Sequence, residues 1–230
     1  MSAATSAASV GSLVYQSSAL DSTTLGFIGI SGLSAKGVKT KNPTLSGDWW
    51  STTESISAGG VTISYSMHAK ITDVNGTVIN SQALLDALSL ANTDRVDTYG
   101  TLTITTTVGT TTATSTMTMG SSSSPLAFTG VGSNSTSAKS VNGTVSFSGS
   151  DSTTNTTYSV SLTYSNVTIA ASGYPSGTVS FTVSSSSSQV YAGTVTFNGT
   201  ATATLAFTSG ASGTYTVYIN TGAVVAASVN

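Results

Sequence analysis

The 230-residue chain contains no cysteine, one histidine, three prolines and only 6% charged residues. The absence of cysteine excludes disulfides, thiolate catalysis and cysteine-ligated metal sites. Six Lys and Arg residues in all form no basic stripe, so we expect no nucleic-acid partner. No run of about 18 apolar residues occurs, so we expect no transmembrane helix. After Asp151 the chain carries no charged residue and no histidine.

The first 16 residues, MSAATSAASVGSLVYQ, lack the charged start and the apolar stretch of a signal peptide. The composition is nevertheless rich in Ser and Thr and poor in charge, which favours an extracellular or cell-surface protein. We therefore expect that a signal peptide has been removed and that Met1 stands in its place. The alternative is a virion or phage-tail component, which is made without a signal peptide.

Serine and threonine dominate the chain, with 44 and 43 residues, while 38% of the residues are hydrophobic and the net charge is −2. Disordered chains usually combine low hydrophobicity with high net charge, so this composition predicts a folded protein. Apolar and polar residues alternate strictly over 61–72, which is typical of a half-buried strand. The segment DVNG at 73–76 predicts a turn, and NSQALLDALSLAN at 80–92, capped by Asn80 or Ser81, predicts the one helix.

Two further segments, 101–119 and 157–169, alternate but change phase partway. Such a change predicts a hairpin or a β-bulge, in the first segment near Gly109. A short unit, Gly-Thr followed by alternating apolar residues, begins at positions 100, 143, 177, 193 and 213. Its unequal spacing argues against a solenoid and against the regular Thr ladder of an ice-binding surface, so we interpret it as a signature of strand entry.

Together these segments predict about ten to twelve strands and one short helix. The expected fold is all-β, an antiparallel β-sandwich of the Ig-like or jelly-roll-like kind. Residues 1–45 lack sustained periodicity and are expected to form an N-terminal extension that serves as a donor strand or linker. Residues 46–230 are expected to form the sandwich.

Near the C-terminus the phrases PSGTVSF, GTVTF, GTATATLAF and SGTYTV follow one another. In this order they resemble the bacterial immunoglobulin-like repeats of surface proteins and some phage tail proteins, over residues 166–227. The resemblance implies an Ig-like C-terminal part, divided from the rest of the sandwich near 166, with an adhesive, spacer or structural role. It brings no catalytic residues to this chain.

Candidate binding residues lie around the two tryptophans of the chain. Asp48 and Glu54 flank Trp49 and Trp50, and no other pair of carboxylates lies beside aromatic rings that can stack on a sugar. These four residues are candidates for glycan binding, with packing of both tryptophans in the core as the alternative. The single His68 lies on the polar face of its predicted strand, and no nucleophile elbow occurs in the chain. We therefore expect no catalytic residue and no enzyme activity.

No metal site and no cofactor is expected either. The DVNG segment resembles the start of a calcium loop, but Leu84 occupies the twelfth position, where such a loop needs a carboxylate. Six asparagines begin N-x-S/T sequons and are candidate glycosylation sites. They are Asn75, Asn134, Asn142, Asn155, Asn166 and Asn198.

The edges of the predicted sheet carry little protection. Exposed edges are usually guarded by Lys, Pro or inward-pointing charge, yet from Thr98 to the C-terminus only Lys139 and Asp151 are charged. The edges are therefore either closed within the fold or paired with another subunit. The apolar segment 25–33 is a candidate assembly segment. Its apolar side chains are Leu25, Phe27, Ile28, Ile30 and Leu33.

Two functions follow from this sequence as expectations. The first is a non-catalytic structural protein that assembles with itself into a filament, layer, appendage, virion or tail. The alternative is an adhesin-like module that binds a glycan or another surface ligand. The first predicts a protein that polymerises or forms a lattice without ligand, and the second predicts a monomer whose tryptophan fluorescence shifts when a glycan binds.

Overall fold

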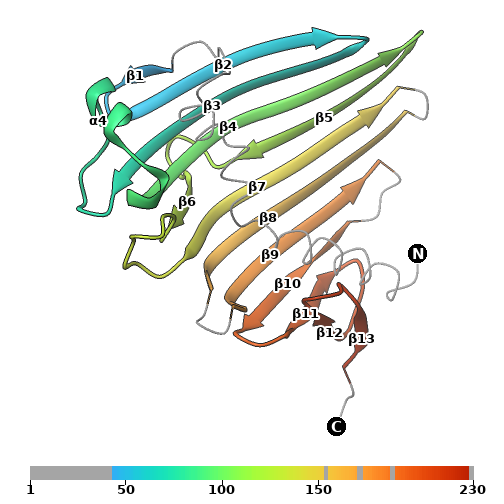
Figure 1. The fold of residues 1–230 in the computed structure, drawn as a ribbon. Coiled ribbons are helices and arrows are strands. Elements are labelled where there is room, and N and C mark those ends of the chain that lie inside the picture. Colours follow the sequence, from blue (N-terminus) through green and yellow to red (C-terminus); the bar gives the residue numbers. More distant parts are fainter. Residues whose placement is uncertain (1–42, 153–154, 170–172, 187–189, 228–230) are drawn as a thin grey trace.

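The computed structural model describes residues 43–152, 155–169, 173–186 and 190–227. These residues form one antiparallel sheet of 13 strands, one short α-helix and a 3-10 helix, η1 (Figure 1). The elements are β1 (Thr44–Ser46), β2 (Trp49–Ala58), β3 (Val61–Asp73), α4 (Gln82–Ala87), η1 (Leu90–Asn92), β4 (Thr93–Val108), β5 (Thr111–Met119), β6 (Leu126–Thr129), β7 (Ser140–Asp151), β8 (Thr156–Ile169), β9 (Pro175–Ser185), β10 (Tyr191–Asn198), β11 (Thr202–Ser209), β12 (Thr214–Tyr218) and β13 (Val224–Ala226). The expected all-β antiparallel class with one short helix is confirmed.

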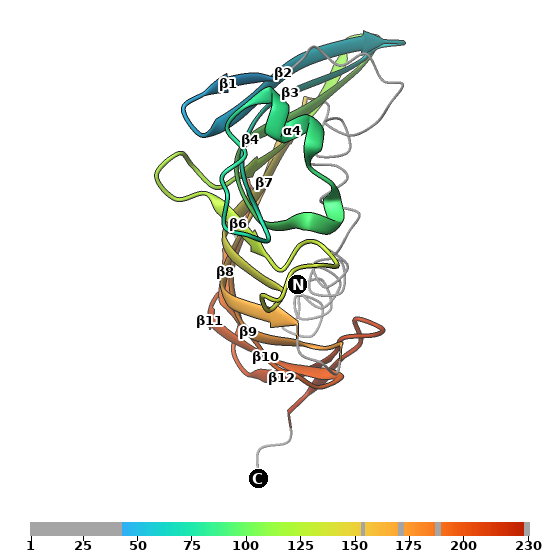
Figure 2. The same cartoon turned by 60° about the vertical axis from the view of Figure 1, so that its left-hand side comes forward.

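The strands follow one another across the sheet almost in chain order. Strands β1 to β5 are sequential neighbours, β5 pairs with β7, and the order then continues to β13, while β6 pairs with β4 and β7. The sheet is strongly bent (Figure 2), which is consistent with an all-β sandwich. Its strand order is that of a meander, whereas Ig-like and jelly-roll sandwiches use Greek-key connections. The described strands exceed the expected ten to twelve because β1, β6 and β13 are too short to show alternation.

Alternation along the strands separates an apolar face from a polar one. The main core covers the apolar face from β3 to β12 and includes Val145, Leu162, Phe181, Val195 and Leu205. A second cluster lies at the β2–β4 end, where the helix α4 covers the sheet (Figure 2). That cluster consists of Trp50, Ile71, Ile79, Leu85 and Val96. Burial of these side chains is the main force that holds the sheet and its helix together.

The helix α4 is shorter than the segment that predicts it. It spans six residues and is followed by η1, which uses the remainder of the predicted helical segment. Ser81 is the cap, and its Oγ accepts the backbone N–H of Leu84 at 3.3 Å. Because only Leu85 of this helix is buried, packing stabilises little more than one turn and a half.

Both predicted phase changes are confirmed. The first is a hairpin, since β4 ends at Val108 and β5 begins at Thr111, with Gly109 at a φ of 62° between them. The second is a bulge in β8, where the pairing with β9 shifts register between Ser165 and Thr168. Asn166 lies in this bulge with a φ of 50°. The bulge moves Val167 back onto the buried face, while Ile169 at the end of the strand stays exposed.

The Gly-Thr units do not mark strand entry as predicted. Gly100 and Gly143 lie well inside β4 and β7, and only Gly213 directly precedes a strand. At Gly100, where φ is 149°, a Cβ would collide with the carbonyl oxygen of Ser66 on the neighbouring strand. At Gly143, where φ is 121°, it would collide with the backbone around Leu126. These glycines let the long strands bend where backbones approach closely, which is how a sheet acquires curvature.

The sheet is continuous and open among the described residues. Residue 166 lies within β8, which pairs with β7 on one side and β9 on the other, so the sheet has no break near 166. At one end β1 pairs only with β2, and at the other end β13 pairs only with β12. The two ends of the sheet do not pair with each other.

Candidate functional site

The polar face of the sheet carries aligned rows of serine and threonine, and we call it the hydroxyl face. One row crosses seven strands through Thr53, Ser66, Thr101, Thr118, Ser146, Ser161 and Thr182. The next consists of Ser55, Ser64, Thr103, Thr116, Ser148, Ser159 and Ser184. A third consists of Ser57, Thr62, Thr105, Thr114, Ser150 and Thr157. Neighbouring strands lie about 4.8 Å apart, so each row is a dense line of hydroxyls.

An ordered ladder thus forms despite the unequal spacing of the Gly-Thr units, against the prediction from the sequence. The pairing register of the meander aligns the rows, and this register does not depend on the spacing of the repeats. The bend of the sheet (Figure 2) nevertheless denies the ladder the flatness that an ice-binding surface needs. The rows therefore provide a hydrated, uncharged surface rather than a template for a crystal.

Many of these hydroxyls bond to each other across strands. The Oγ atoms of Ser55 and Ser64 lie 2.8 Å apart, and those of Ser159 and Ser184 lie 2.7 Å apart. A hydroxyl offers one donor and two acceptor positions, so each pair keeps capacity for a further partner. The rows are therefore ordered by their own hydrogen bonds and still able to bond to water or to a polar ligand.

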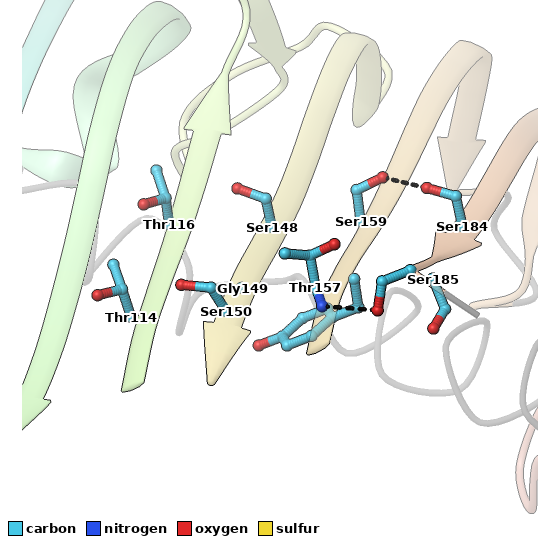
Figure 3. A pocket seen from close by; sticks show the side chains of 11 residues that line it. Thr114, Thr116, Ser148, Gly149, Ser150, Thr157, Ser159, Ser184 and Ser185 are labelled. Carbon is cyan, nitrogen blue, oxygen red and sulfur yellow. Dashed lines mark hydrogen bonds between the residues drawn. The ribbon is translucent and has the colours of Figure 1, made fainter. Parts of the chain in front are cut away.

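The hydroxyl face has two shallow hollows. The first, of about 610 Å³, lies over β2–β4 and is lined by residues such as Thr53, Ser66 and Thr101. The second, of about 520 Å³, lies over β5 and β7–β9, where Figure 3 shows small hydroxyl side chains on all four strands. Thr103 and Thr116, whose hydroxyls lie 3.1 Å apart, separate the two hollows. Both volumes fall in the range of about 300–1,000 Å³ that is usual for ligand sites.

Three aromatic side chains gather on the hydroxyl face beside the first hollow. The rings of His68 and Tyr99 stack with centroids 4.3 Å apart and planes 9° apart. Trp49 meets Tyr99 edge-on at 5.0 Å. His68 and Tyr99 are opposite each other in β3 and β4, one row away from Ser66 and Thr101. All three rings are half-buried and so present part of their surface to solvent.

Two ion pairs flank this aromatic cluster. Lys70 Nζ lies 2.8 Å from Asp48 Oδ2, and the hydrogen bond from Lys70 is the main cause that lowers the pKa of Asp48. Arg95 binds the carboxylate of Asp97 through both Nε and Nη2, at 2.7–3.0 Å. This hydrogen bonding raises the pKa of Arg95. Each pair is internally neutralised, so the cluster adds polar groups to the face without adding net charge.

The structure separates the four residues that the sequence suggests for glycan binding. Trp50 is in the core at 3% exposure, where its Nε1 donates to the carbonyl oxygen of Ile79 at 2.5 Å, so its ring is not available to a ligand. Glu54 points to the other face and accepts the hydroxyl of Tyr65 at 2.8 Å. Burial first, and this hydrogen bond second, raise the pKa of Tyr65 to about 12. Trp49 and Asp48 remain with the hydroxyl face.

Two residues of the site, His68 and Tyr99, were not among the binding residues predicted from the sequence. His68 was expected on a polar face, and it is there, but as a stacking partner of Tyr99. Its Nδ1 lies 2.7 Å from Ser51 Oγ, which is the distance of a nucleophile and its base. The carboxylates on this face, Asp48 and Asp97, bond to Lys70 and Arg95 rather than to the imidazole. The arrangement is therefore better suited to holding the ring in place than to activating the serine.

The remaining candidates are distributed over the molecule. The assembly segment, with Leu25, Phe27, Ile28, Ile30 and Leu33, lies outside the described residues. Five of the six sequon asparagines are exposed, while Asn142 is half-buried and its Oδ1 accepts the backbone N–H of Asn166 at 2.7 Å. Within the described ranges, no three His, Asp or Glu side chains lie close enough together to hold a metal ion.

None of the described helices has the length and hydropathy needed to cross a membrane.

No protein-family model matches the chain, and neither a curated protein nor a solved structure is significantly similar to it. The candidate site is therefore defined by its own geometry: a cluster of rings, two neutralised ion pairs and two hydroxyl-lined hollows on one face of an open sheet.

Proposed function

We propose that the protein is a non-catalytic structural subunit that assembles with copies of itself by pairing the edges of its sheet. The observation that carries this proposal is the open sheet. Beyond Ser51, no strand that the structure describes lies along the outer side of β2, because β1 covers only residues 49–51. Backbone groups at such an edge can pair with another chain, which then extends the sheet.

The outer strands carry little of the usual protection against such pairing. The one charged residue in the unpaired part of β2 is Glu54, whose carboxylate accepts the hydroxyl of Tyr65. Residues 55–58 of β2, which we call the β2 edge, have the sequence SISA and contain neither charge nor proline. Ile56 in this edge is 59% exposed. At the other end of the sheet, Val225 of β13 is 54% exposed in a stretch without any charge. Charged residues and prolines are what natural edges use to prevent association, so their absence favours association here.

The composition of the surface fits a position outside the cell, on a cell surface or in a virion. The hydroxyl rows hydrate one face with few titrating groups, so its hydration depends little on pH. The resemblance of residues 166–227 to bacterial immunoglobulin-like repeats supports the same role, although the strands there follow a meander order. None of these features requires a catalytic residue or a cofactor.

The substitution Ile56→Lys tests the role of the β2 edge. An inward-pointing lysine at an exposed edge position opposes strand addition, so we expect it to weaken self-association at least tenfold. The matched control is Val108→Lys, which adds the same charge at a side chain 74% exposed at the end of β4, beside the β4–β5 hairpin. The measurement is light scattering on a sizing column over a hundredfold range of concentration, with negative-stain microscopy of the same fractions.

The proposal is supported if the wild-type protein forms concentration-dependent oligomers, filaments or sheets. These assemblies should be lost in Ile56→Lys and kept in Val108→Lys. A wild-type protein that stays monomeric over the whole range would contradict it. Oligomers that both variants retain equally would also contradict it, because association would then use a surface other than the β2 edge.

A further inference from the structure

We propose that the hydroxyl face also binds a neutral polysaccharide, with its sugar rings on the Trp49–His68–Tyr99 cluster and its chain in the hollow over β2–β4. This inference goes beyond self-assembly, because it concerns the side chains of the hydroxyl face rather than the backbone of an edge strand. The hollow does border the β2 edge, since Ser55 and Ile56 also line it. A carbohydrate needs two things from a protein surface. These are aromatic rings for its C–H faces and closely spaced donors and acceptors for its hydroxyls, and both are present here.

The three rings of the aromatic cluster are held in fixed positions and form a platform for a sugar ring. The imidazole of His68 is fixed by its contact with Ser51 Oγ at 2.7 Å and by stacking on Tyr99. Trp49 is fixed in turn by its edge-on contact with Tyr99. Aromatic rings held in place before binding lose little conformational entropy when a ligand arrives. Packing in a core does not account for this cluster, because the rings lie on the face opposite the apolar cores.

The hollow next to the rings supplies the polar contacts. Its volume is about 610 Å³, and its hydroxyl lining comes from six residues on three neighbouring strands. These are Thr53, Ser55, Ser64, Ser66, Thr101 and Thr103. Their hydroxyls both donate and accept, as do those of a sugar, and those of Ser55 and Ser64 already order each other. A ligand rich in hydroxyls can replace surface water here bond for bond.

The charges of the site select for a neutral ligand. Among the described residues that line the hollow, Glu54 alone is charged, and its carboxylate accepts Tyr65 Oη on the opposite face. The Asp48–Lys70 and Arg95–Asp97 pairs cancel in sign beside the rings. An acidic polysaccharide would need an unneutralised cation, and a cationic one an unneutralised carboxylate. The ion pairs instead offer fixed polar groups at the rim.

The second hollow makes the site long. It continues the same rows beyond Thr103 and Thr116 as far as β9. From β2 to β9 the two hollows span seven neighbouring strands. At the usual strand spacing these correspond to a path of roughly 29 Å. A path of this length suits an extended chain of several sugars rather than a monosaccharide. The structure therefore assigns a polymer as the ligand, lying across the strands.

The test uses the full chain and three insoluble neutral polysaccharides: cellulose, chitin and starch granules. The variants are Tyr99→Ala, which removes the platform, and Thr101→Arg, which fills the hollow from an exposed position and leaves the rings intact. The control is Tyr218→Ala, which removes a 45% exposed tyrosine from β12. Thermal unfolding of each variant first establishes that it is folded. Depletion from solution then gives Kd for each polysaccharide, at a concentration where light scattering shows the same association state for all variants.

We expect wild type to bind at least one of the three polymers, with a Kd that rises at least tenfold in both Tyr99→Ala and Thr101→Arg and stays within twofold in Tyr218→Ala. No depletion by any of the three polymers would overturn the inference. Equal Kd values in all variants would overturn the location of the site.

Discussion

At the scale of single residues, glycine shapes this sheet. Gly100 stands in the middle of β4, directly opposite Met67 of β3 and Met119 of β5. Its φ of 149° and the nearness of the Ser66 carbonyl leave no room for a Cβ. Glycine at such a point lets a strand of 16 residues bend instead of ending. The bend separates the part of β4 beside α4 from the part that carries the hydroxyl rows.

Replacing Gly100 tests this role. In Gly100→Ala the new methyl group collides with backbone, which cannot move aside like a side chain, so we expect a loss of more than about 3 kcal/mol in the free energy of unfolding. The matched change is Gly109→Ala in the β4–β5 turn, where φ is 62° and nothing lies within 4 Å of the added Cβ. There only the left-handed backbone is penalised, by about 1–2 kcal/mol. Denaturant unfolding followed by circular dichroism measures both, and equal losses would contradict the bend.

The site residues show what single positions in the sequence can and cannot reveal. The alternation of β3 places His68 on the polar face, and the structure agrees. Trp49 and Trp50 are adjacent and identical, so only the strand register decides which one enters the core. Tyr99 gave no signal at all, because its partners lie 31 and 50 positions earlier in the chain. A cluster built by pairing three strands is not visible until the register is known.

At the scale of elements, short-range signals were the most reliable. The DVNG turn, the Ser81 cap, the hairpin at Gly109 and the bulge in β8 each depend on neighbouring residues, and each is present. The Gly-Thr units were misinterpreted for a physical reason. Glycine ends a strand or bends it according to how close the next backbone lies, and that distance is set by tertiary packing.

The DVNG turn carries a prediction about pH. Asp73 Oδ1 accepts the backbone N–H groups of Asn75 and Thr77 at 2.9 and 2.8 Å, and the bond from Thr77 is the largest cause that lowers the pKa of Asp73 below 3.8. A pKa lower in the folded state means that the carboxylate contributes stability above its unfolded pKa, and that this contribution is lost as the pH falls through the folded value. Wild type should therefore be more stable than Asp73→Ala at neutral pH, by a margin that shrinks as the pH falls below the ordinary range of a carboxyl pKa.

The control for this turn is Asp73→Asn, which keeps an acceptor oxygen but does not titrate in this range. The difference in stability between Asp73→Asn and Asp73→Ala should not change with pH. Urea unfolding at a series of pH values measures all three proteins. A constant margin between wild type and Asp73→Ala would show that the carboxylate charge plays no part in the turn.

At the scale of the whole molecule, the main feature is a wide sheet that does not close among the described residues. The antiparallel class and the longer strands follow from the sequence, since alternation and turn residues repeat along the chain, whereas three short strands do not. Whether the ends of the sheet meet depends on small twists and bends accumulated over many strands, which no local pattern records. The sequence therefore left undecided whether the unprotected edges close within the fold or pair with another subunit. In the described part of the structure the edges do not close.

The two faces of the open sheet also explain how the surface is hydrated with so few charged residues. The main core lies on one face of the sheet, the helix α4 covers the second cluster on the same face, and the other face carries aligned hydroxyls. The ionised groups of β3 and β4 concentrate at the end near α4, where two ion pairs flank the aromatic cluster. In our proposals, binding uses the hydroxyl face and assembly uses the β2 edge, which meet at Ser55 and Ile56.

The measurement that tests the central claim most directly is amide hydrogen exchange of the β2 edge, residues 55–58, at low and high protein concentration. If this edge pairs with a second copy, amides that point outward from it become hydrogen-bonded on association, and their exchange slows. We expect protection of residues 55–58 to rise with concentration in wild type and to stay constant in Ile56→Lys, while the β4–β5 turn around Gly109 exchanges rapidly throughout. Exchange in residues 55–58 that is the same at every concentration would contradict assembly through this edge.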